Sequence, residues 1–129
     1  MGGTAFDAQN SFYHPTMITH TSDQMLIAGE ETFGPVAALF PFKDEAEVIT
    51  RANNTIYGLA AYFYTRDLGQ AFRVSEGLEY GMIGVNEALL SSEMVPVGGV
   101  KQSGYGREGG HWAMDDFMTI KYTLMGGLV

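Results

Sequence analysis

The sequence predicts an α/β fold in which parallel strands alternate with helices. Three observations predict it: apolar runs of strand length, helix-start signals between them, and the regular alternation of the two patterns. The order strand, helix, strand, helix, strand occupies residues 36–85. Strands that are joined by a helical crossover pair in parallel, because the crossover returns the chain to the same end of the sheet.

Two short elements and one longer apolar run come first. Residues 15–19 are β-prone and predict a short strand. Thr21-Ser22-Asp23 offers N-cap residues for a helical turn that reaches Ile27. Residues 36–42 form an apolar run, interrupted by Pro41, that is too short for a typical helix and suits a buried strand.

Two helices begin at sequence signals that resemble the capping box. Asp44 with Glu47 is such a pair, in which each side chain can satisfy a free backbone donor of the first turn. The apolar spacing that follows predicts a helix that ends near Asn53. The same reasoning predicts a second helix from Asp67 to Gly77.

Further strands and one long connecting segment complete the chain. Residues 59–64 and 82–85 are short apolar runs, the first of them rich in aromatic side chains, and both predict strands. Residues 86–110 form a glycine-containing segment whose length is typical of a functional loop or of a misassigned element. Residues 112–117 suggest a short helix and 118–125 a terminal strand. Because no linker or repeat interrupts the chain, we expect one unit.

The composition indicates a folded, acidic protein. Seven basic and fifteen acidic side chains give a formal net charge of −8, which disfavours nucleic acid as a partner. No apolar run reaches the ~20 residues that a membrane span needs, and we expect no secretory signal. We therefore expect a cytoplasmic protein. The absence of cysteine excludes disulfides, thiolate metal sites and cysteine nucleophiles.

Familiar catalytic and binding motifs lack their required context. Residues 104–109 read G-x-G-x-x-G, but no central strand precedes them, so a turn-rich loop is favoured over a dinucleotide fingerprint. The three histidines lack metal-ligand spacing, and we expect no metal site. Ser91 or Ser92 with His111 could be drawn as part of a hydrolytic triad, but no nucleophile elbow supports it.

Glu30-Glu31-Thr32-Phe33-Gly34-Pro35 is harder to dismiss. Two acids precede an aromatic side chain and a glycine-proline turn, just before a predicted buried strand. One interpretation is a helix end with two solvated acids. The other places one acid and one ring at the end of a strand, where α/β proteins bind ligands.

Three segments together resemble the NAD(P)-dependent aldehyde dehydrogenase superfamily. Residues 30–35 resemble its E-E-x-F-G-P motif, residues 52–61 its A-N-x-x-x-Y-G-L-A-A segment, and residues 97–108 its G-G-x-K-x-S-G-x-G-R-E segment. Their order and spacing match as well. Thr32 in the first motif and Leu90-Ser91-Ser92 in the long loop are most similar to the succinate-semialdehyde dehydrogenases.

The resemblance implies the C-terminal half of the family's catalytic domain, a parallel sheet with helices, over residues 1–117. Residues 118–129 would form the oligomerisation arm strand. The family's nucleotide-binding domain, catalytic cysteine, general-base glutamate and oxyanion asparagine would lie upstream, so we expect no catalytic residue here and no activity from the chain alone. The expected partners are further copies or a missing N-terminal half. The alternative is a self-associating assembly or interaction module without catalysis.

The resemblance also assigns four binding residues. Glu31 would accept hydrogen bonds from the hydroxyls of the nicotinamide ribose, and Phe33 would pack beside the nicotinamide. Ser91 would hydrogen-bond the distal carboxylate of a small aldehyde substrate. Val97 stands where the family usually has phenylalanine, and this smaller side chain would widen the aldehyde pocket or loosen its wall. The cofactor would be NAD or NADP in the complete enzyme, with none bound by this chain alone.

Overall fold

The computed structural model describes residues 2–7, 9 and 11–128, which form two compact units, Met1–Val48 and Ile49–Val129. The sequence predicted one unit, whereas the structure has two, and the division between them falls within a helix. Met1, Ala8, Asn10 and Val129 lie outside the described residues, as therefore do both outer ends of the expected division into 1–117 and 118–129. That division stays a prediction.

The first unit contains two parallel strands and a helical turn. Strand β1 (Thr16–Ile18) pairs with β2 (Val36–Ala38), and α1 (Leu26–Gly29) lies between them in the chain. Both strands were predicted, but β2 stops at Ala38 instead of Phe42. Pro41 lacks an N–H for strand pairing, which disfavours an extension of β2 through this position. No residue of β2 is fully buried, so the expectation of a buried strand was wrong.

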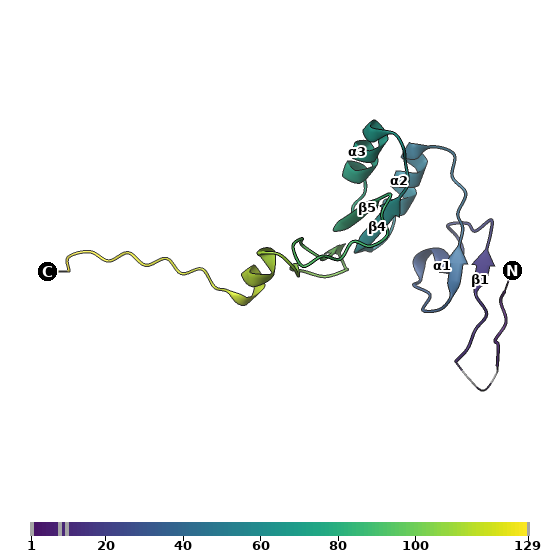
Figure 1. The fold of residues 1–129 in the computed structure, drawn as a ribbon, viewed down its shortest axis with the longest axis horizontal. Coiled ribbons are helices and arrows are strands. Elements are labelled where there is room, and N and C mark those ends of the chain that lie inside the picture. The colour runs from purple at the N-terminus through teal and green to yellow at the C-terminus, as the bar shows by residue number, and fades with distance from the viewer. Residues whose placement is uncertain (1, 8, 10, 129) are drawn as a thin grey trace. The chain divides into compact units, whose positions relative to one another are not determined.

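The second unit is built around a strand–helix–strand arrangement. Strands β4 (Ala60–Phe63) and β5 (Met82–Val85) pair in parallel, and α3 (Leu68–Gly77) connects them. Figure 1 shows the two strands side by side with α3 next to them. Helix α2 (Glu45–Asn53) crosses the division between the units. The predicted α/β class is confirmed, although the described strands form three two-stranded sheets and no larger one.

Side-chain caps explain where the two longer helices begin. The Asp44 carboxylate accepts a hydrogen bond from the Glu47 N–H, and the Glu47 carboxylate accepts one from the Lys43 N–H, both at 2.9 Å. At α3 the Asp67 carboxylate accepts from the Gln70 N–H at 2.8 Å. The two cap signals therefore predicted the helix starts correctly, because each satisfies backbone donors that the first turn leaves free.

Replacing Asp67 tests the α3 cap directly. Asp67→Ala removes the acceptor of the Gln70 N–H, and we expect it to lower the stability of α3 by about 1 kcal/mol. Amide hydrogen exchange of residues 68–77 measures this loss locally. Asp67→Asn keeps a cap acceptor and should retain most of the protection; equal loss in both variants would show that the cap bond is unimportant.

The sequence predicted no helix or strand within the glycine-containing segment, residues 86–110. Strand β6 (Val100–Lys101) pairs antiparallel with β3 (Tyr57–Gly58), and the Gly58 N–H donates to the hydroxyl of Ser103, 45 positions along the chain. A 3₁₀ helix, η1 (Trp112–Phe117), follows where a short helix was expected. Residues 118–128 make no strand pairs in the described part of the chain, so the terminal strand expected over residues 118–125 is not formed. Their role as an arm stays a prediction.

Few apolar side chains are fully buried, and many are half-buried. Val74 of α3, at 7% exposed, is the one buried apolar side chain among the described residues. A folded chain of this length ordinarily buries roughly two thirds of its unfolded surface. Large apolar side chains of the terminal segment are especially open, as Ile120 is 100% exposed. Within the described residues, no helix has the length and apolar character of a membrane span.

Candidate functional site

Glu31 and Phe33 lie in the irregular segment that connects α1 to β2. Glu30 closes α1, because its N–H donates to the Leu26 carbonyl at 2.9 Å. Both of the predicted cofactor residues face solvent, and Phe33 is 92% exposed. A phenyl ring so exposed loses the stabilisation that burial would give it.

The topology places this motif at the amino end of β2. Pairing runs in parallel from Thr16 opposite Val36 to Ile18 opposite Ala38, so the chain enters the strand directly after the motif. Ligands of open α/β sheets bind beyond the carboxyl ends of the strands. The strand-end argument therefore gives Glu31 and Phe33 no support, and their predicted role depends on the family motif.

Ser91 is exposed on the segment that follows β5. Glu87 shapes the start of this segment, because its carboxylate accepts hydrogen bonds from the N–H groups of Leu89 (3.1 Å) and Ala88 (2.9 Å). These two bonds, the one from Leu89 foremost, lower the pKa of Glu87 below its ordinary 4.5. The turn is therefore stabilised above pH 4.5 and loses that stabilisation as the pH falls through the lowered pKa.

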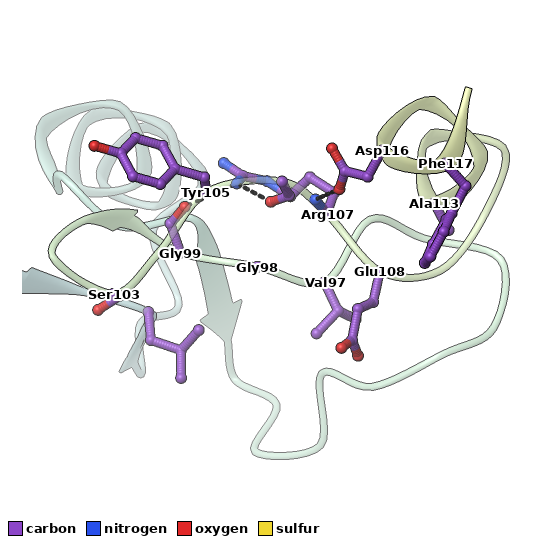
Figure 2. A pocket seen from close by; sticks show the side chains of 12 residues that line it. Val97, Gly98, Gly99, Ser103, Tyr105, Arg107, Glu108, Ala113, Asp116 and Phe117 are labelled. Atoms are coloured by element: carbon purple, nitrogen blue, oxygen red, sulfur yellow. Dashed lines mark hydrogen bonds between the residues drawn. The ribbon is translucent and has the colours of Figure 1, made fainter. Parts of the chain in front are cut away.

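Val97 lines a cavity of about 470 Å³ in the second unit (Figure 2). Val97 and Glu108 exchange both of their backbone hydrogen bonds, at 2.7 and 2.8 Å, which folds the glycine-rich loop back on itself. The other lining residues come from this loop, from η1 and from the residue before β4: Leu59, Gly98, Gly99, Ser103, Tyr105, Gly106, Arg107, Ala113, Asp116 and Phe117.

Arg107 holds the wall of this cavity together. Its Nη1 donates to the Gly99 carbonyl at 2.8 Å and to the Gly106 carbonyl at 2.7 Å. Its backbone N–H donates to the Asp116 carboxylate at 3.2 Å, which connects the loop to η1 (Figure 2). The cation is thus engaged by backbone carbonyls, and a structural role follows from its geometry.

The cavity can hold a small group but offers no activated nucleophile. The Ser103 hydroxyl accepts a hydrogen bond from the Gly58 N–H at 2.9 Å, which ties the loop to β3. The chain has no cysteine. In the described residues, no three histidine, aspartate or glutamate side chains gather as a metal site. Backbone and side-chain hydrogen bonds thus fix the shape of the cavity wall.

The predicted site residues are distributed over both units. Val97 reaches the cavity, whereas Ser91 is not among its lining residues. Glu31 and Phe33 belong to the first unit. The G-x-G-x-x-G segment forms a turn-rich loop, as expected, with Gly106 at φ 75° and no strand directly before it.

Two residues that were not predicted as site residues, Lys101 and Asn53, connect β6 and α3 with the end of α2. Lys101 Nζ donates to the Asn53 carbonyl at 2.8 Å and to the Thr55 carbonyl at 3.2 Å, and it pairs with the Glu79 carboxylate at 2.7 Å. The Asn53 amide donates to the Gly77 carbonyl at 2.7 Å. The one sequence signal for these two residues is that they belong to the motifs at 52–61 and 97–108. No local pattern predicts their contacts, because each partner is distant from them in the sequence.

Comparisons with known proteins agree with this architecture. The model of the aldehyde dehydrogenase family matches residues 1–123. The chain is 50% identical over 125 residues to the succinate-semialdehyde dehydrogenase [NADP(+)] of Escherichia coli, covering 97% of this chain and 26% of that protein. It is 54% identical over 127 residues to a 3-sulfolactaldehyde dehydrogenase of Pseudomonas putida, with 98% and 26% covered.

The solved structures agree as well. The succinate-semialdehyde dehydrogenase of Burkholderia pseudomallei matches with a TM-score of 0.90 and 52% identity, over 95% of this chain and 26% of that chain. The chain therefore spans about a quarter of the length of the relatives it matches. Because the family model covers nearly every residue, the chain belongs to the aldehyde dehydrogenase family.

Proposed function

We propose that this chain supplies part of an NAD(P)-dependent enzyme that oxidises a short aldehyde with a distal anionic group, of the succinate-semialdehyde type. The observation that carries the proposal is the match of 97% of the chain, at 50% identity, to a dehydrogenase named for that aldehyde. The Pseudomonas relative acts on a sulfonate-bearing aldehyde by its name, so carboxylate and sulfonate are the two anions to compare.

Four side chains have proposed roles in that enzyme. Glu31 accepts hydrogen bonds from the hydroxyls of the nicotinamide ribose, and the exposed Phe33 packs beside the nicotinamide. The Ser91 hydroxyl donates a hydrogen bond to the distal anion, and Val97 forms the apolar wall of the aldehyde pocket. The solvent exposure of Glu31, Phe33 and Ser91 supports these roles, since each is available to a ligand.

The chain alone should neither turn over aldehyde nor bind the cofactor detectably. It has no cysteine to form the thiohemiacetal, and two cofactor contacts are too few to offset the cost of association. We propose that it acts as part of a homo-oligomer or with a separate upstream half, in the cytoplasm. The open apolar residues of 118–128 support association through this segment.

A chimera of the Escherichia coli relative, in which this chain replaces the matching segment, tests the proposal. We expect it to reduce NADP⁺ with succinate semialdehyde. Ser91→Ala should raise the KM for this substrate about tenfold, because a hydrogen bond to a charged group is lost, and leave the cofactor KM unchanged. Glu31→Gln should instead raise the KM for NADP⁺ and leave the KM for succinate semialdehyde unchanged.

Three outcomes are informative. A folded chimera without activity would overturn the proposed function. Equal effects of Ser91→Ala on succinate semialdehyde and on butanal, which lacks the distal anion, would overturn the role of Ser91. An activity carried by the 129-residue chain without any upstream segment, and abolished by Glu31→Gln, would overturn its dependence on a partner.

A further inference from the structure

The segment that carries Ser91 begins at a residue with an unusual backbone conformation. Asn86 directly follows β5 and has φ 57°, in the left-handed region that favours glycine. Asparagine tolerates this region better than most residues, because its short amide can hydrogen-bond nearby backbone. The turn at Asn86 therefore ends β5 and redirects the chain into residues 87–92.

Asn86 also continues the pairing of the two parallel strands. Its backbone N–H donates to the Phe63 carbonyl at 2.9 Å. Its side-chain Oδ1 accepts from the Thr65 N–H at 2.8 Å, and its Nδ2 donates to the Thr65 carbonyl at 2.7 Å. The amide thus satisfies both backbone groups of Thr65 in the way that another strand residue would.

The residues after Asn86 are held as tightly. Glu87 accepts hydrogen bonds from the Ala88 and Leu89 N–H groups, which fixes the first turn of the segment. A Cβ built on Gly84 would lie 2.4 Å from the Glu87 carbonyl and 3.0 Å from the Leu90 side chain. Residues 87–90 therefore fold back over β5 at Gly84. Ser91 is the next residue after Leu90.

We propose that Asn86 is a positioning residue, which sets the direction of the segment 87–92 and so the place of Ser91. The proposal rests on the proposed function for the role of Ser91, but its structural half stands on the contacts of this chain alone. Asn86 does not touch the substrate in this account. It acts through the left-handed turn and through the two hydrogen bonds to Thr65.

Amide hydrogen exchange of the full 129-residue chain tests the structural half. Asn86→Gly keeps the left-handed turn but removes the side chain, so exchange at Thr65 should rise about fivefold to tenfold, as one lost hydrogen bond implies. Asn86→Ala also opposes the turn, so exchange at Ala88 and Leu89 should rise too. Asn86→Asp keeps the acceptor for the Thr65 N–H and should restore part of its protection.

Asn54→Ala is the matched control, because Asn54 is exposed and its side chain makes no hydrogen bond in the described part of the chain. It should leave exchange at Thr65 and Leu89 unchanged. Unchanged exchange at Thr65 in both Asn86→Gly and Asn86→Ala would overturn the proposal, as would an equal rise in Asn54→Ala.

Steady-state kinetics of the Escherichia coli chimera test the functional half. Asn86→Gly should raise the KM for succinate semialdehyde about fivefold, with kcat and the cofactor KM within about twofold, because one contact is displaced. A purely structural role would lower the amount of active enzyme and leave the KM unchanged, which would overturn the positioning role. A chimera without activity in every variant would overturn the proposed function, and exchange would still decide the role of Asn86.

Discussion

Gly81→Ala should be among the most damaging single substitutions in the second unit. A Cβ at residue 81 would lie 2.0 Å from the carbonyl oxygen of Gly98, a backbone atom that cannot rotate away. Relieving this overlap would push the glycine-rich loop at Gly98 away from Gly81. It would also strain β3, because the Gly81 N–H donates to the Gly58 carbonyl at 3.0 Å. We expect the free energy of unfolding of this region to fall by about 3 kcal/mol, at the upper end of the cost of overpacking.

Amide exchange at Met82, Val97 and Glu108 measures this loss, because exchange reports local stability even where unfolding is not all-or-none. Gly126→Ala is the matched control: its Cβ would meet nothing within 4 Å, and its φ lies outside the left-handed region. Protection at Val97 and Glu108 that survives Gly81→Ala would contradict the close approach of these backbones.

Local features were the part of this fold that the sequence could predict. The cap pairs at Asp44 and Asp67 predicted the starts of α2 and α3, because a cap depends on residues three positions apart. Residues 82–85 were predicted as a strand with the bounds that β5 has. The parallel pairing of β4 with β5 followed from the crossover between them.

The contacts that shape the cavity loop could not be predicted in the same way. The pairing of β3 with β6 and the three bonds of Lys101 join residues more than 20 positions apart, and no periodic pattern encodes them. The role of Asn86 is a similar case, because its partner Thr65 lies just beyond the end of the neighbouring strand β4, 21 positions away in the sequence. The predicted binding residues came from the resemblance to the family, and the structure adds the two backbone hydrogen bonds with Glu108 that hold Val97 in place.

Lys101→Met should have the second large effect. The Nζ group satisfies the carbonyls of Asn53 and Thr55 at the end of α2, where a cation also interacts favourably with the helix dipole. Methionine keeps the length of the side chain but leaves both carbonyls without this donor. Because the Lys101 side chain is 24% exposed and solvent screens its charge, we expect a loss of about 2 kcal/mol, measured by exchange at Gln102 and Ser103.

A double-mutant cycle with Glu79→Gln separates the two kinds of partner. The Glu79 side chain is 59% exposed, so its coupling to Lys101 should stay below about 1 kcal/mol and shrink further in high salt. The rest of the stability lost in Lys101→Met, which should be larger and independent of salt, would then come from the hydrogen bonds to the carbonyls at the end of α2. Lys121→Met, in the terminal segment, is the control for loss of a lysine and should leave the exchange unchanged. A coupling that accounts for the whole loss would mean that the ion pair, and not the end of α2, fixes Lys101 in its left-handed conformation at φ 55°.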